Sequence, residues 1–317
     1  MKSRALWQSV AALALAPLFA APQSAHAATA SFVALLPGAQ GVGAHFAETW
    51  RPNWTHFTPF SINGQAYFMS YRGADTGELD ISRMNGNGMG YTSTFSEQWA
   101  PGWTHFMPFT TGGQSYFMAY RGGDSGRVTF NRLRVDGSGY YPTMDENWRK
   151  GWTHFMPFSL NGRAYFLSYR GADTGEAVIS RIHNDGSGYV DTFKSNWGKG
   201  WTHFTPFSLH GQTYFLSYRI GDGQAVISRL HPDGSGYVNV WAQRWRAGWT
   251  HFVPFVSQGE ARLLSYRASS GEMDISRFLP GGQGTQSAWA NNVGTNWTHL
   301  MPYVHGGQPN FMIYRAQ

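Results

Sequence analysis

The chain has 317 residues, with 16% aromatic residues, only 13% charged residues, 39 glycines and no cysteine. This composition excludes an intrinsically disordered protein, because disordered segments are poor in aromatic residues and rich in charge. The lack of cysteine excludes a disulfide scaffold and a lipid-anchored lipoprotein. The net charge of +6 is modest and comes from arginines at fixed positions rather than from a lysine-rich tail, so we expect no nucleic-acid partner.

Residues 1–27 have the three parts of a secretory signal peptide. Lys2 and Arg4 give a basic start, residues 6–21 are apolar, and the Ala-His-Ala sequence ending at Ala27 forms a small-x-small cleavage motif. We therefore predict cleavage after Ala27 and a mature chain, residues 28–317, that is secreted or periplasmic. No later stretch approaches the roughly 20 apolar residues of a spanning helix, so we expect no transmembrane segment in the mature chain.

The remaining chain contains Trp-Thr-His six times, at intervals of 48 or 49 residues. The six repeats begin at residues 54, 103, 152, 201, 249 and 297. Each Trp is followed 18 residues later by the arginine of a Tyr-Arg pair. In four units a second arginine is followed 16 residues later by a closing tryptophan. In a fifth unit Arg277 is followed by Val293, and in the sixth Ala34 stands in place of the arginine before Trp50. Such a period predicts one closed repeat domain over residues 28–317.

Each repeat has the pattern of four short antiparallel strands. In the third repeat these are residues 152–158, 163–170, 177–182 and 189–197, and the segments between them carry Gly and Asn, which accept positive φ. Four strands in a period of 40 to 50 residues are the signature of a β-propeller blade. The sequence therefore predicts an all-β, six-bladed β-propeller with four antiparallel strands per blade.

The two ends of the chain predict how the ring closes. Residues 32–50 align with residues 81–99, matching Trp50 with Trp99, so the mature chain starts with the third and fourth strands of a blade. It ends just after a second strand, at Arg315. We expect residues 28–53 to complete the repeat that begins at residue 297, because pairing the two halves removes open sheet edges. A proline in each first strand predicts an edge strand that lines the central channel.

Two repeated motifs resemble parts of metal sites, namely the six Trp-Thr-His histidines and the Asp-Gly-Ser-Gly turns at residues 136, 185 and 233. Equivalent residues of six blades lie too far apart to be ligands at about 2 Å, and each turn has one acidic residue, whereas calcium takes six to eight oxygen ligands. We therefore favour histidines that are hydrogen-bonded between blades, ordinary hairpin turns, and no metal or other cofactor.

The closing tryptophans are the first set of candidate ligand-binding residues. They follow the outermost strand beside variable loops, where an indole face can stack on the C–H face of a sugar ring. Packing between blades is the alternative role, and we favour it for the tryptophan that begins each Trp-Thr-His. The candidates are Trp50, Trp99, Trp148, Trp197 and Trp245.

The arginines of the Tyr-Arg pairs are the second candidate set. A long cation inside a packed sheet repeat is costly unless it is paired. An aspartate three residues later is a partner for four of them, but not for Arg267 or Arg315. A structural role and a ligand contact through the planar guanidinium therefore both stay open. The candidates are Arg72, Arg121, Arg170, Arg219 and Arg267.

Catalysis has little support in the sequence. Every candidate polar residue is copied around the ring, whereas an enzyme site needs an asymmetric constellation of nucleophile, base and stabiliser. We find no nucleophile elbow, P-loop or His-Glu-x-x-His motif and name no catalytic residue. We favour a binding protein over an enzyme.

The near-tandem copies of Trp-Thr-His-Phe-x-Pro-Phe, Tyr-Phe-Leu-Ser-Tyr-Arg and Asp-Gly-Ser-Gly-Tyr resemble the repeats of secreted bacterial β-propellers. The chain is broadly similar to tachylectin and tectonin propellers and to six-bladed fucose-binding lectins. The resemblance implies carbohydrate binding between neighbouring blades, with surface or matrix glycans as partners and with Arg and Trp in contact with the sugar. The regular glutamate of the fucose lectins is replaced at Arg127 and Gln224, so the sugar stays open. We expect a multivalent lectin; the alternatives are a protein-binding scaffold and a polysaccharide lyase or hydrolase acting at the channel.

Overall fold

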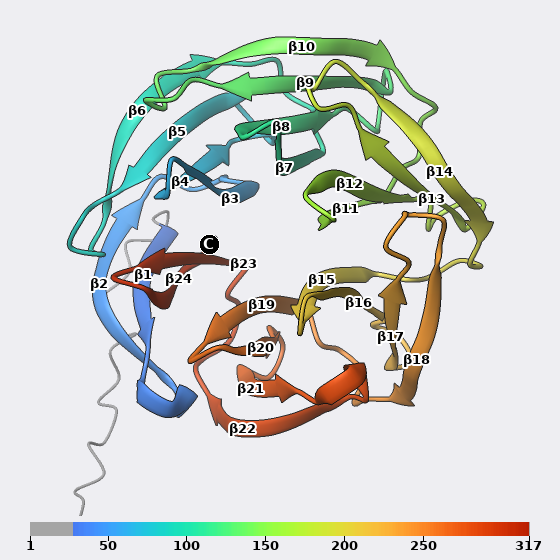
Figure 1. Cartoon of the computed structure of the whole chain (residues 1–317). Helices are drawn as coiled ribbons and strands as arrows, with labels where there is room; N and C mark the ends of the chain where they lie inside the picture. The colour runs from blue at the N-terminus through green and yellow to red at the C-terminus, as the bar shows by residue number, and fades with distance from the viewer. Residues whose placement is uncertain (1–27, 317) are drawn as a thin grey trace, which may run out of the picture.

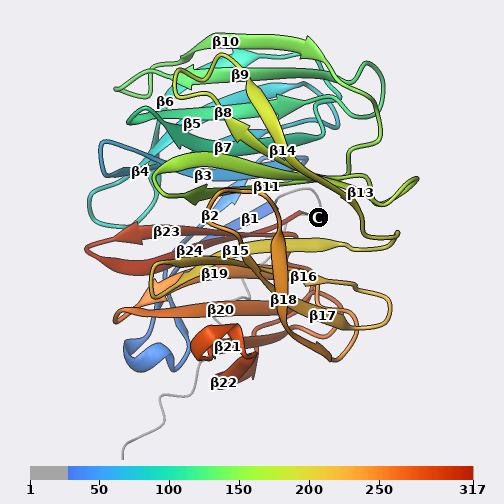
Figure 2. The ribbon, with the colours of Figure 1, turned by 45° about the vertical axis from the view of Figure 1, so that its right-hand side comes forward.

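The computed structural model describes residues 28–316, so the predicted signal peptide lies outside the described residues. The described chain has 24 β-strands and two short 3-10 turns, η1 (Pro37–Ala39) and η2 (Pro280–Gly282). The strands form six four-stranded antiparallel sheets around a central axis (Figures 1 and 2). This is the predicted six-bladed propeller. Within residues 28–316, no helix is long and apolar enough to cross a membrane.

The first two strands of each blade form its inner half. The first strands are β3 (His56–Ile62), β7 (His105–Thr111), β11 (His154–Leu160), β15 (His203–Leu209), β19 (His251–Ser257) and β23 (His299–His305). The second strands are β4 (Gln65–Tyr71), β8 (Gln114–Tyr120), β12 (Arg163–Tyr169), β16 (Gln212–Tyr218), β20 (Glu260–Arg267) and β24 (Gln308–Arg315). Each first strand is the inner edge of its sheet and contacts the first strands of both neighbouring blades. The proline in each therefore sits on an edge, as predicted, where its missing N–H breaks no ladder.

The third and fourth strands form the outer half. The third strands are β5 (Glu78–Met84), β9 (Arg127–Leu133), β13 (Glu176–Ile182), β17 (Gln224–Leu230), β21 (Glu272–Phe278) and β1 (Ala28–Leu35). The fourth strands are β6 (Tyr91–Gln98), β10 (Tyr140–Asn147), β14 (Tyr189–Asn196), β18 (Tyr237–Arg244), β22 (Thr285–Asn292) and β2 (Val42–Trp50). Blades 1 to 5 take four consecutive strands each from β3 onward, and blade 6 combines β23, β24, β1 and β2.

Blade 6 joins the two ends of the chain. Its strand order is β2-β1-β24-β23, and β1 pairs antiparallel with β24 from Thr29 opposite Arg315 to Ala34 opposite Asn310. The predicted closure by N-terminal third and fourth strands and C-terminal first and second strands is therefore confirmed. This pairing covers the edges that β1 and β24 would otherwise expose at the point where the ring begins and ends.

The second strands are almost wholly buried, and the tyrosine before each repeated arginine is fully buried. Its hydroxyl donates to a carbonyl in the connection to the next blade, as from Tyr120 to Arg149 (2.9 Å) and from Tyr218 to Arg246 (2.9 Å). These bonds fix the end of the propeller that carries the connections between the second and third strands and between blades, which we call the loop end. The opposite end carries the tight turns between first and second and between third and fourth strands, and we call it the hairpin end.

Candidate ligand-binding site

The Trp-Thr-His histidines link each blade to the next. His56 Nε2 donates to the Thr104 carbonyl oxygen at 2.9 Å, and His299 Nε2 closes the circle on the Thr55 carbonyl oxygen at 3.0 Å. The same bond is present at all six junctions. The Thr55 hydroxyl also lies 2.8 Å from His56 Nδ1. The predicted hydrogen-bonding role between blades is confirmed.

Burial lowers the pKa of all six of these histidines, because the charged imidazolium loses its hydration. The pKa falls to about 4 for His154 and His299. The rings are therefore neutral near pH 7. Among residues 28–316, no group of three His, Asp or Glu side chains lies close enough to bind a metal ion.

The repeated Tyr-Arg arginines lie against the Trp-Thr-His tryptophans of their own blades. The Arg170 guanidinium carbon is 5.7 Å from the Trp152 ring centre, and the other five arginines have the same contact at 4.3–5.9 Å. Each of the four predicted aspartates is in ion-pair contact with its arginine, as in Arg121 with Asp124 at 2.6 Å. The structure thus gives each of these arginines a cation–π contact within its own blade.

Arg267 lacks the turn aspartate of the other blades but pairs with Glu272 at 3.2 Å. Arg72 and Arg170 reach the equivalent glutamates, Glu78 and Glu176, in addition to their aspartates. Sequence reasoning missed this partner because it considered only the turn three residues away. Arg315 has no ion pair with a carboxylate of the described chain and lies 4.3 Å from the Trp297 ring centre.

The closing tryptophans pack on the following blade. Gly126, in the loop before β9, has a φ of +74°, and a Cβ there would come within 2.1 Å of the Trp148 carbonyl oxygen. Only glycine permits the Trp148 backbone to come this close to the loop before β9. The close contact holds Trp148 where its ring can face blade 3. The Trp148 ring then stacks on Phe166 at 5.9 Å and meets Tyr189 edge-on at 5.0 Å.

Two equivalent hollows open beside these tryptophans. The hollow between blades 2 and 3 encloses about 190 Å³, and the hollow between blades 3 and 4 encloses about 260 Å³. Each is lined by a closing tryptophan, the next Trp-Thr-His tryptophan, a phenylalanine of the second strand and a tyrosine of the fourth. These residues are Trp148, Trp152, Phe166 and Tyr189 in the first hollow and Trp197, Trp201, Phe215 and Tyr237 in the second.

Polar groups face the aromatic residues across each hollow. In the first, the Ser180 hydroxyl donates to Asp191 at 2.7 Å, and in the second Ser228 donates to Asn239 at 2.8 Å. A second-strand serine lines both hollows as well, at positions 168 and 217. The site therefore combines flat apolar rings with hydroxyl, amide and carboxylate groups that can accept or donate hydrogen bonds.

The two hollows differ in charge. Arg149 pairs with Glu176 at 3.5 Å beside the first, and Lys194 pairs with Asp191 at 3.0 Å. Gly198 and Gln224 stand at the places of Arg149 and Glu176 beside the second, and the residues lining that hollow are all uncharged. The second hollow is therefore neutral.

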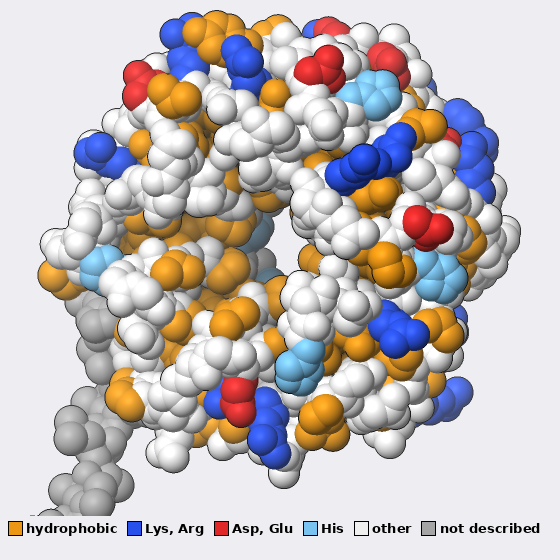
Figure 3. Space-filling model, viewed as in Figure 1, with side chains coloured by type: hydrophobic (Ala, Val, Ile, Leu, Met, Phe, Trp, Pro, Cys, Tyr) orange, Lys and Arg blue, Asp and Glu red, His pale blue; other side chains and the backbone are white. Residues whose placement is uncertain are grey.

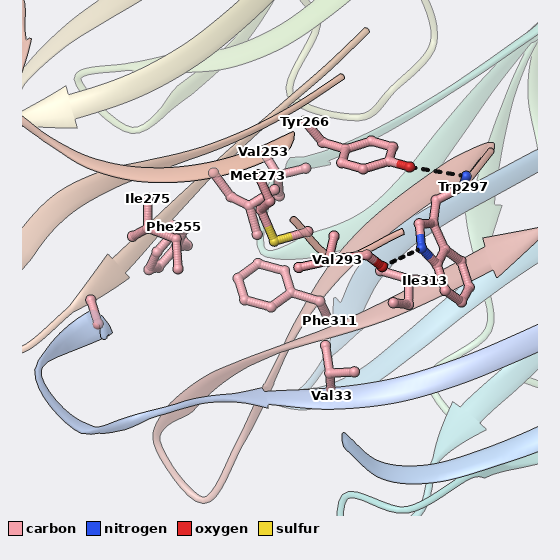
Figure 4. Packing of buried hydrophobic residues seen from close by; sticks show 12 residues of the cluster. Val33, Val253, Phe255, Tyr266, Met273, Ile275, Val293, Trp297, Phe311 and Ile313 are labelled. Carbon is pink, nitrogen blue, oxygen red and sulfur yellow. Dashed lines mark hydrogen bonds between the residues drawn. The ribbon is translucent and has the colours of Figure 1, made fainter. Parts of the chain in front are cut away.

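The junction between blades 5 and 6 is apolar instead. Val293 stands in place of the closing tryptophan and packs with Val33, Phe311 and Ile313 in one buried cluster (Figure 4). The Trp297 indole N–H donates to the Val293 carbonyl oxygen at 3.2 Å. The closing tryptophan of the other five junctions is missing here.

The structure brings Trp148 and Trp197 into the hollows but places the Arg170 guanidinium behind Trp152, outside their lining. Sequence reasoning missed the tyrosine, serine and Asp or Asn residues that complete each hollow. A signal was present, because Tyr189 and Tyr237 end the repeated Asp-Gly-Ser-Gly-Tyr motif.

No family model matches the chain, and no curated protein matches it in sequence. Solved structures match at low identity. A 6-phosphogluconolactonase-like protein from Bacteroides fragilis is 11% identical, with 84% of this chain and 78% of that chain covered and a TM-score of 0.56. The periplasmic gluconolactonase of Pseudomonas aeruginosa is 12% identical, with 84% and 97% covered and a TM-score of 0.52. A GH43 β-1,3-galactosidase with galactodeoxynojirimycin is 9% identical, with 77% and 95% covered and a TM-score of 0.55.

At these identities the comparisons show the fold alone. The chain is a six-bladed β-propeller with similar hollows at two successive blade junctions. These three similar structures are not of the tachylectin type, so a lectin function is a separate hypothesis that rests on the site.

Proposed function

We propose that this protein is an exported, multivalent carbohydrate-binding propeller whose sites lie between neighbouring blades. The observation that carries the proposal is the pair of equivalent hollows, each with two tryptophans, a tyrosine and a serine-rich polar side. An aromatic ring matches the C–H face of a sugar, and hydroxyl, amide and carboxylate groups match its hydroxyls. The signal-like residues 1–27 support export to the periplasm or beyond.

Within this proposal the closing tryptophans of the two hollows, Trp148 and Trp197, contact the sugar directly. The repeated arginines hold the Trp-Thr-His tryptophan in place, because each guanidinium lies against that ring. Arg219, whose side chain is 32% exposed, is more accessible to a ligand than Arg170 at 9%. Several weak sites on one rigid ring would bind a glycan-covered surface by avidity.

A glycan array probed with residues 28–317 tests the proposal, followed by calorimetry with the best-bound soluble glycan. Gln224 lines the neutral hollow, and its side chain is half-exposed. Gln224→Ala should weaken binding several-fold, as expected for the loss of one hydrogen bond. The matched control is Gln212→Ala at the hairpin end of the same blade, which should bind as the unmodified protein does.

Binding to no glycan on the array would overturn the proposal, and so would an equal loss in both variants. Turnover of an array glycan, with release of a shortened product, would identify an enzyme instead.

A further inference from the structure

The hairpin end carries a second series of arginines. Five of them occupy the same place, the next-to-last residue of the third strand, in blades 1 to 5. They are Arg83, Arg132, Arg181, Arg229 and Arg277. Four are exposed and Arg181 is half-exposed. Arg134 and Arg163 lie at the same end, in the turn after β9 and at the start of β12.

These seven arginines have no ion pair with a carboxylate of the described chain, whereas five of the six Tyr-Arg arginines at the loop end do. The aspartates of the nearby turns, such as Asp136 and Asp185, accept hydrogen bonds from the serine two residues later. Three such turns carry an aspartate, and Glu260 at this end is already paired with Arg262 at 2.7 Å. The hairpin end therefore has an excess of positive charge.

Blade 2 shows how two of these arginines are held. The Arg132 and Arg134 guanidinium carbons lie 5.6 Å and 4.5 Å from the Tyr141 ring centre. Together with Gln114, Ser138 and Asp136 they line a wide, open hollow of about 520 Å³, in which the single carboxylate accepts the Ser138 backbone N–H. A guanidinium on an aromatic ring keeps its planar donor edge free for an anion.

Blade 3 continues this basic surface. The Tyr116 hydroxyl of blade 2 donates to the Asp185 carbonyl oxygen in the blade 3 turn at 3.1 Å, so the two blades are in direct contact at this end. Going around the ring at the hairpin end, Arg132 and Arg134 of blade 2 are therefore followed by Arg163 and Arg181 of blade 3. Figure 3 shows Lys and Arg side chains in separate patches around the rim of the ring.

We propose that the hairpin end binds a linear anionic polysaccharide, and that Arg132, Arg134, Arg163 and Arg181 form the main contact. Arginine forks bind sulfate and carboxylate groups through paired hydrogen bonds. A sugar chain carrying such groups at intervals fits discrete arginines around a rim. The exposed Tyr141 ring is already contacted by Arg132 and Arg134, and the other exposed large apolar residues among the arginines, Val135, Val190 and Val238, offer no ring on which bases stack. A nucleic acid is therefore the less suitable partner.

The test measures the affinity of the full mature chain for heparin as a function of salt, with hyaluronan and a short DNA duplex as comparison ligands. Hyaluronan has carboxylates without sulfates, so it separates the two anionic groups. The Arg132→Gln/Arg134→Gln variant should bind heparin at least about tenfold more weakly, and the slope of log affinity against log salt should fall by about two. The matched control is Lys150→Gln/Lys199→Gln, which removes the same charge at the loop end and should leave the slope unchanged.

The substituted arginines are exposed, so the melting temperature should not change, and measuring it separates lost contacts from lost folding. Binding to heparin or hyaluronan that depends on the hairpin-end arginines would support the proposal. No retention of either polysaccharide at low salt, equal losses in both double variants, or binding to DNA alone would overturn it.

Discussion

Arg170 shows at the scale of one residue how a nearly buried cation is accommodated in this repeat. Its side chain is 9% exposed, contacts Asp173 and Glu176, and lies against Trp152. Asp173 lies in the turn after the second strand, Glu176 begins the third strand, and Trp152 precedes the first strand. The arginine thus joins three segments of its blade beside the proposed sugar site.

Arg170→Ala should lower the free energy of unfolding by about 1 to 3 kcal/mol, because Asp173 loses its partner, Glu176 keeps only Arg149, and Trp152 loses its contact. Denaturant unfolding measures this. Arg219→Ala is the comparison, since that arginine is 32% exposed and its aspartate lies 3.4 Å away, so a smaller loss is expected. If both variants unfolded like the unmodified protein, the arginines would have no structural role.

The six Trp-Thr-His histidines make the stability of the protein depend on pH. The folded protein keeps these rings neutral, whereas the unfolded chain binds protons below its ordinary pKa near 6.5. Their contribution to stability is therefore complete above pH 6.5 and is lost as the pH falls toward about 4. A pKa held one unit below its ordinary value corresponds to about 1.4 kcal/mol.

We expect the unfolding free energy to fall steeply between pH 6.5 and about pH 4.5. In His154→Gln the decrease should be smaller, because glutamine can still donate to the Thr202 carbonyl oxygen but takes up no proton. His183→Gln, at an exposed residue of a hairpin turn, is the control and should keep the original slope. If the unfolding free energy changed equally with pH in all three proteins, the Trp-Thr-His histidines would not govern acid stability.

At the scale of the element, β23 and β24 decide whether the ring closes. They supply the inner half of blade 6 and cover the edge of β1. The first strands of neighbouring blades also contact each other, so the loss of β23 leaves β19 and β3 each without one of their two neighbours. An array opened here has two exposed sheet edges.

Deleting residues 298–317 should therefore abolish cooperative unfolding and lead to aggregation, an effect far larger than that of an ordinary terminal truncation. Circular dichroism during heating and size-exclusion chromatography measure both. Deleting residues 316 and 317 alone is the control, because these residues follow β24, and it should leave a monodisperse protein. A soluble truncated protein that melts cooperatively would argue against closure as a condition for folding.

For the whole molecule, six similar blades do not give six similar sites. At the junction between blades 5 and 6, Val293 stands in place of the closing tryptophan and packs with Val33 and Ile313. An ion pair of the Arg149–Glu176 type also lies beside the junctions of blades 6 and 1 and of blades 4 and 5. The ring is therefore chemically uneven around its circumference.

Calorimetry with a glycan found on the array should give fewer than six sites per chain, with the neutral hollow between blades 3 and 4 binding first. Trp197→Ala should remove that site and leave the weaker ones, because the other junctions keep their own tryptophans. Six equal sites would show that the closing tryptophans are not involved in binding.

The sequence by itself determined the repeat and therefore the fold. The six Trp-Thr-His motifs predicted six blades, and the proline in each first strand indicated the inner edge strand. The match of Trp50 to Trp99 predicted which strands close the ring. These features are readable because strand pairing within a blade is local and each blade repeats the same pattern. The bond from histidine to the next blade also followed from the regular spacing.

Only the tertiary structure decided how the hollows are composed. Trp197 comes from the end of blade 3, whereas Tyr237 and Asn239 come from the outer strand of blade 4, some 40 residues later. Their meeting depends on how one sheet packs against the next, which strand periodicity does not specify. Likewise, the partner of Arg267 was set by strand register, because Glu272 lies directly opposite it across β20 and β21. Strand register and the packing of one sheet on the next decide which side chains meet, and the repeat pattern alone specifies neither.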